Sequence, residues 1–200
     1  MKKLKFLSFI AAVCISQACN DSNKDSVTEA KDSNHNALDS SAMVNRTDTA
    51  MRVNTTPVDK DATDFAVEAA NGGMMEVDLG KYAQQNAMSD RVKNFGAMMV
   101  RDHSAANEEL KTLSSSKNIA LPMEVGSDAK KHMDDLMKKK GKDFDKAYMD
   151  MMLDDHKKDV KAFQKAANEC KDADLKSFAG KTLPTLQTHL DSAKAITGKK

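Results

Sequence analysis

The chain has 200 residues, with 31 Lys and Arg against 30 Asp and Glu, 4% aromatic residues and no Trp. Without a basic field or aromatic side chains for base stacking, this composition argues against nucleic-acid binding, and the lack of aromatics also argues against a β-sandwich. Only 3 Pro and 8 Gly interrupt the sequence, which predicts an all-α protein.

The first 18 residues have the pattern of an export signal. Three lysines lie among the first five residues, and the apolar run over 6–15 that follows is too short to span a bilayer. The segment Ser16-Gln17-Ala18-Cys19 resembles a bacterial lipobox, although Ser16 and Gln17 depart from its usual residues. We therefore predict a signal peptide over 1–18, lipidation of Cys19 and a place in the cell envelope, as an outer-membrane lipoprotein or in the periplasm. Cleavage without lipidation is the alternative.

Residues 19–58 are predicted to form the lipidated N-terminus and a flexible tether. They are rich in Asn, Asp, Ser and Thr, without an apolar period that would fold them. His35 lies in this stretch and is predicted to be solvated. The folded domain is predicted over 59–197, where Cys170 is the one cysteine, so no disulfide framework is expected.

Four long segments of the domain carry apolar side chains at helical spacing. A shorter helix is expected between the second and the third, and Pro184 is predicted to kink or restart the last. The expected helices start at Asp61 or Thr63, at Ser89-Asp90, at Ser127, near Lys142 and at Asp172 or Asp174.

Two near-copies of one six-residue sequence lie in the second and third long helices, at 98–103 and 151–156. Each has two methionines, two variable residues, an aspartate and a histidine. Because residues four apart share a helix face, Met99 lies with His103, and Met152 with His156.

Each long helix has one polar, metal-capable residue on its apolar stripe: Glu76, His103, His156 and His189. Counted from each hairpin at about 1.5 Å per residue, Glu76 and His103 lie at depths that agree to within about one helical turn, and so do His156 and His189. The sequence therefore predicts that all four meet in one layer of a four-helix bundle. The adjacent Gly72-Gly73 leaves room for a neighbouring helix or side-chain cluster to come close.

The segments around Glu76 (75–80), Arg101-Asp102-His103 and 183–190 resemble a bacterial family of unknown function, catalogued as predicted outer-membrane proteins. The resemblance covers about 63–196 and implies an up-and-down four-helix bundle of the ferritin-like type. No Glu-x-x-His occurs in the sequence, so the ligands of a carboxylate-bridged di-iron site are not expected.

Two hypotheses explain the four polar residues. In the first, Glu76, His103, His156 and His189 bind one transition metal ion, Cu, Zn, Mn or Fe. Met99 and Met152 are then candidate auxiliary thioether ligands. Asp102 and Asp155 are candidate acceptors that orient histidines of neighbouring helices. In the second, the same four residues form a buried hydrogen-bond network that only fixes helix register.

A third hypothesis is an interaction module, a lipid-anchored bundle whose charged outer faces contact partners in the envelope. The sequence contains no catalytic triad order, no phosphate-binding glycine loop and no nucleophilic cysteine with a base, so it does not predict an enzyme. The expected partner of the protein is the membrane, which it would contact through the lipid anchor.

Overall fold

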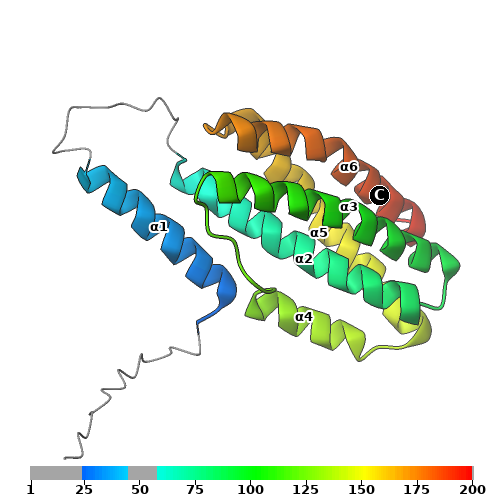
Figure 1. Cartoon of the computed structure of the whole chain (residues 1–200). Coiled ribbons are helices and arrows are strands. Elements are labelled where there is room, and N and C mark those ends of the chain that lie inside the picture. The colour runs from blue at the N-terminus through cyan, green and yellow to red at the C-terminus, as the bar shows by residue number, and fades with distance from the viewer. Residues whose placement is uncertain (1–23, 45–57, 200) are drawn as a thin grey trace, which may run out of the picture.

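The computed structural model describes residues 24–44 and 58–199, and side chains over 24–40 and 58–199. These residues form helices without a strand, so the all-α prediction is confirmed (Figure 1). The helices are α1 (Ser26–Val44), α2 (Lys60–Asn86), α3 (Asp90–Ser116), α4 (Ser127–Met137), α5 (Gly141–Glu169) and α6 (Ala173–Thr197).

The long helices α2, α3, α5 and α6 form the four-helix bundle, as two antiparallel hairpins packed side by side (Figure 1). The short helix α4 carries the chain back along α2, from Asn71, which accepts a hydrogen bond from Gly126 N, to Tyr82, which donates one to Met137 O. Consequently α3 and α5 run in the same direction rather than alternating. A single long crossover of this kind is the connection found in ferritin-like bundles.

Aspartates cap the first and the last helix of the bundle. Asp59 accepts from Ala62 N at the start of α2, two to four residues earlier than predicted, and Asp172 accepts from the first amides of α6. The helix α6 continues through Pro184, so the predicted restart does not occur. Within the described ranges, no helix has the length and apolar character needed to cross a bilayer.

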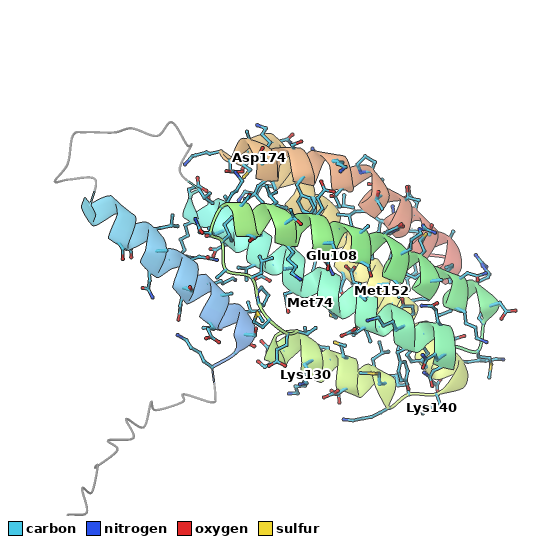
Figure 2. The ribbon with its side chains drawn as sticks, viewed as in Figure 1. Met74, Glu108, Lys130, Lys140, Met152 and Asp174 are labelled. Carbon is cyan, nitrogen blue, oxygen red and sulfur yellow. The ribbon has the colours of Figure 1, made fainter. Side chains whose placement is uncertain are left out.

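Two apolar clusters fill the bundle, one toward each end. Between them lies a polar layer formed by Glu76, His103, His156 and His189. The first cluster includes Phe95, Met99, Phe144 and Met152, and the second includes Leu110, Phe163, Leu175, Phe178 and Leu186. Charged side chains such as Glu108, Lys140 and Asp174 lie on the outside (Figure 2). The polar layer is therefore closed off from water along the bundle axis.

Two glycines allow α2 and α3 to approach closely. A Cβ at Gly80 would lie 2.7 Å from the carbonyl oxygen of Gly96, and a Cβ at Gly96 would lie 2.8 Å from that of Gly80. The predicted space at Gly72-Gly73 is used only by Gly73, whose added Cβ would meet Asn107 Oδ1 at 2.1 Å.

The helix α1 lies inside the predicted tether, so that prediction is wrong for residues 26–44. The side chain of Asn34 is buried and exchanges two hydrogen bonds with the backbone of Ala120, at 2.9 and 2.7 Å. His35, predicted to be solvated, contacts Asp64 Oδ1 at 2.8 Å, and Lys31 pairs with Glu68. The helix is polar because it docks on the bundle through hydrogen bonds and ion pairs rather than through an apolar stripe.

Candidate metal centre

The structure brings the four predicted residues together in the middle of the bundle, one from each long helix. The exposed fractions of Glu76, His103, His156 and His189 are 2%, 6%, 0% and 1%. Each lies between the two apolar clusters on its own helix, for example His103 between Met99 and Leu110. The predicted convergence in one layer therefore agrees with the geometry.

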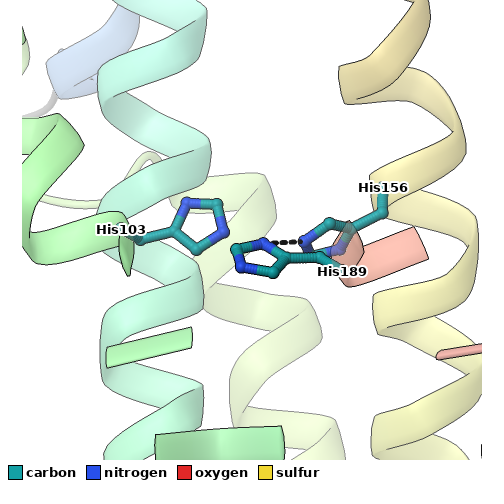
Figure 3. A group of neighbouring side chains, drawn as sticks. All are labelled: His103, His156 and His189. Atoms are coloured by element: carbon teal, nitrogen blue, oxygen red, sulfur yellow. Dashed lines mark hydrogen bonds between the residues drawn. The ribbon is translucent and has the colours of Figure 1, made fainter. Parts of the chain in front are cut away.

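The three imidazoles face one another from α3, α5 and α6 (Figure 3). Their ring centroids lie 5.2 to 5.6 Å apart, and one ligand nitrogen from each ring lies within 4.8 Å of the other two. His156 Nε2 and His189 Nδ1 are the closest pair, at 3.2 Å.

The nitrogen on the other side of each ring contacts an oxygen. His103 Nδ1 lies 2.9 Å from Glu76 Oε2, and His189 Nε2 lies 2.9 Å from Asp102 Oδ2. His156 Nδ1 donates to Met152 O, one turn earlier in α5, at 2.9 Å. Glu76 Oε1 lies farther from that nitrogen, at 3.4 Å, and has no hydrogen-bond partner within the described residues.

Asp102 is oriented by Arg101, whose Nε and Nη2 donate to its two oxygens at 2.7 and 2.9 Å. Partial burial raises the pKa of Asp102, but the hydrogen bonds from Arg101 and His189 outweigh burial and lower the pKa overall. Asp102 is therefore an ionised acceptor, and His189 Nε2 carries the hydrogen that it receives.

Burial keeps the three rings neutral. It lowers the pKa of His103 and of His156 to about 4 each, although Glu76 opposes the shift at His156. Burial also lowers the pKa of His189, against the opposing effect of Asp102. A neutral imidazole has one N–H and one lone pair, so each ring has a single hydrogen to donate.

This assignment of hydrogens leaves two lone pairs facing each other. His156 uses its hydrogen on Met152 O and His189 uses its own on Asp102, so His156 Nε2 and His189 Nδ1 both present a lone pair across 3.2 Å. His103 Nε2 is buried and has no hydrogen-bond partner among the described residues. A metal ion or an added proton removes this opposition, and so does the other tautomer of His156, which places its hydrogen on Nε2 toward His189.

The donor set fits a metal ion. Two imidazole nitrogens bound at about 2.0–2.1 Å to a tetrahedral ion lie about 3.3 Å apart, close to the 3.2 Å between His156 Nε2 and His189 Nδ1, and the His103 nitrogen lies within 4.8 Å of both. Histidine ligands usually donate their second N–H to a carboxylate or a backbone carbonyl, as His189 and His156 do, and His103 Nδ1 lies 2.9 Å from Glu76. The buried histidine group could therefore hold one ion, with a fourth coordination position left open.

Glu76 lies on the outer side of His103 rather than at the point that the rings face. Among the described residues, a second candidate ligand group joins Glu76 to His156 and Asp159, but no group unites Glu76 with all three histidines. Burial raises the pKa of Glu76, with His156 opposing the shift.

Asp159 was missed in the sequence, although it follows His156 by three residues and so lies on the same side of α5. Tyr148 lies two turns before His156, and its hydroxyl is buried and has no hydrogen-bond partner in the described chain. The signal for both was a polar group at helical spacing from a predicted site residue.

The residues predicted to assist the histidines, two methionines and two aspartates, differ in their contacts. Met99 and Met152 are fully buried in the first apolar cluster, where Met152 contributes its carbonyl oxygen. Asp102 lies against a histidine of a neighbouring helix, as predicted, whereas Asp155 pairs with Lys158 at 3.2 Å. Cys170 ends α5 as a free thiol whose pKa is raised by burial.

A family model described as Domain of unknown function (DUF4142) matches residues 47–196. The chain belongs to this family. A search of the curated proteins and a search of the solved structures found no match. The family description gives no activity. The function must therefore be argued from the four polar residues in the middle of the bundle.

Proposed function

We propose that this protein is an exported, lipid-anchored envelope protein whose bundle holds a single transition metal ion between His103, His156 and His189. The observation that carries this proposal is the convergence of three buried imidazoles, with His156 Nε2 and His189 Nδ1 3.2 Å apart and His103 Nε2 without a hydrogen-bond partner in the described chain. One metal ion would bind all three rings, whereas a hydrogen-bond network leaves His103 Nε2 unpaired.

Glu76, Asp102 and the carbonyl oxygen of Met152 then serve as acceptors that fix each ring with a lone pair toward the ion. Their three contacts with the rings all measure 2.9 Å. Imidazole ligands suit Zn, Cu(II) and Fe(II), whereas Mn prefers carboxylate and carbonyl oxygens. We therefore place Mn last among the four metals and assign no ligand role to the thioethers of Met99 and Met152.

Metal analysis of tag-free protein tests the proposal. We expect about one ion per chain after incubation with Zn, Cu(II) or Fe(II) and desalting, because the three histidines form a single group of ligands. His103→Ala should lose the ion, while His132→Ala, which changes an exposed histidine of α4, should retain it. Equal and negligible metal content in all three proteins would favour the hydrogen-bond network instead.

Export and lipidation rest on the sequence of residues 1–19, which lie outside the described residues. The basic start, the short apolar run and Cys19 at the cleavage point support a lipid anchor. Mass spectrometry of the mature N-terminus should find acylated Cys19 in the membrane fraction. Cys19→Ala should release the protein from that fraction, and an unmodified Cys19 in the wild-type protein would refute the anchor.

A further inference from the structure

A small cavity lies directly beside the polar layer, on the side of the second apolar cluster. Its volume is about 30 Å³, and its lining includes both Glu76 and His103. Since roughly 10–15 Å³ on this measure accommodates a water molecule, the cavity has room for a ligand of two or three non-hydrogen atoms.

The lining combines polar and apolar side chains. Asn107 and Asp159 join Glu76 and His103 as its polar members, while Phe163, Phe178 and Leu186 are apolar. Glu76 Oε1 is buried and has no hydrogen-bond partner in the described chain, and His103 Nε2, also unpartnered, is the atom assigned to the ion. A ligand in this cavity can therefore offer a hydrogen bond to Glu76 beside the ion.

The lining selects a neutral ligand. Burial raises the pKa of both carboxyl groups, Glu76 and Asp159, so the cavity disfavours charge, and no lysine or arginine of the described chain lines it to pair with an anion. The apolar walls likewise disfavour a hydrated cation, because they cannot replace its water shell. A small neutral molecule with an O–H donor satisfies both sides, and hydrogen peroxide has the required size and two such donors.

We propose that this cavity is the binding site for a neutral, peroxide-sized molecule that reaches the open coordination position of the metal ion beside His103. This inference rests on the proposed metal site. It adds a substrate class to that site, small neutral molecules that bind from the Glu76–Asp159 side.

Nitric oxide is a suitable probe because it is neutral and diatomic and gives Fe(II) a characteristic high-spin EPR signal when it binds the iron. Fe(II)-loaded wild-type protein, kept anaerobic, should develop this signal. Gly72→Leu and Ala106→Leu enlarge two residues of the cavity lining and should lose the signal while retaining Fe(II). An added Cβ at Gly72 meets nothing within 4 Å, so the first carbon of the new side chain fits without a shift of the backbone.

Gly180→Leu is the matched control, since Gly180 is exposed on α6 and outside the cavity lining. Wild-type protein that holds Fe(II) but gives no nitrosyl signal would overturn the cavity proposal and leave the metal site intact. A signal that persists in both cavity-filling variants would also overturn it. Failure of the wild-type protein to take up Fe(II), Zn or Cu(II) would instead refute the proposed function itself.

Discussion

We expect His156→Leu to be at least as stable as the wild type without metal, and less stable than the wild type when metal is added. Without metal, His156 presents a lone pair to His189 at 3.2 Å in a site with no solvent exposure. Replacing a whole buried ion pair or triad by hydrocarbon of similar volume is neutral or stabilising by about 1–4 kcal/mol. His156→Leu removes one member of the layer, so it gains only the lower part of this range, because Met152 O loses its hydrogen bond from the ring. The ring also has an edge contact with Phe95, at 6.3 Å between centroids, and its loss offsets part of the gain. We therefore expect the metal-free variant to equal the wild type or to exceed it by about 2 kcal/mol.

With metal, the wild type should be the more stable of the two proteins. A ligand present at 100 times its dissociation constant stabilises the native state by about 2.7 kcal/mol. For a domain of this size, that free energy corresponds to a rise in Tm of roughly 5–11 °C. The wild type should show this rise, whereas His156→Leu lacks one of the three imidazoles and should show little of it.

Thermal unfolding in a chelator and in Zn, Cu(II) or Fe(II) provides the measurement. His132→Leu, on the exposed side of α4, is the control and should respond to metal as the wild type does. If His156→Leu is destabilised by the same amount with and without metal, the histidine is part of a structural network and the lone-pair argument is wrong.

Three further outcomes follow from the same contacts. Asp102→Asn should weaken metal binding about 10- to 100-fold by calorimetry, because it removes the carboxylate that orients a ligand, whereas Asp155→Asn should not. Burial and the nearby Glu76 and Asp155 raise the pKa of Asp159, against His103 and Lys158. The folded protein therefore keeps a proton that the unfolded chain releases above about pH 4, and stability falls as pH rises toward the folded-state pKa. In urea unfolding without metal, the stability advantage of Asp159→Asn over the wild type should grow across this pH range, by at most about 1.4 kcal/mol per unit; a constant difference would contradict the raised pKa. Gly96→Ala should destabilise the protein by about 1–3 kcal/mol through overpacking against Gly80, while Gly72→Ala should stabilise it by up to about 1 kcal/mol, both measured as shifts in Tm.

The bundle could be predicted from the sequence because its signals are local. Each long helix has an apolar stripe, and α2 and α6 also have a capping aspartate at their start, so their positions follow from residues within a few turns of one another. The helix α1 lacks such a stripe. Its contacts join residues far apart in the sequence, such as Asn34 with Ala120 and His35 with Asp64, and no local pattern reports them.

The members of the polar layer were also predictable, since Glu76 and three histidines interrupt otherwise apolar stripes. Their relative orientation was not. Whether Glu76 faces the shared centre or the back of His103 depends on helix rotation and side-chain rotamer, which the spacing of residues does not determine. Asp159 lies beside the apolar stripe of α5 rather than on it, so the stripe alone does not predict it.

The cost of burying these groups is the strongest reason to assign them a ligand. The bundle places two carboxyl groups, three imidazoles and the Tyr148 hydroxyl in or beside one layer between two apolar clusters, where each unpaired polar atom costs about 1–3 kcal/mol. Register alone can be specified by a single satisfied polar residue. Here Glu76 Oε1, His103 Nε2 and the Tyr148 hydroxyl lack a hydrogen-bond partner within the described chain, and the closest contact between the rings opposes two lone pairs. A metal ion relieves the histidine part of this cost without protonating rings whose burial disfavours charge, which is why a metal explains the layer better than a hydrogen-bond network does.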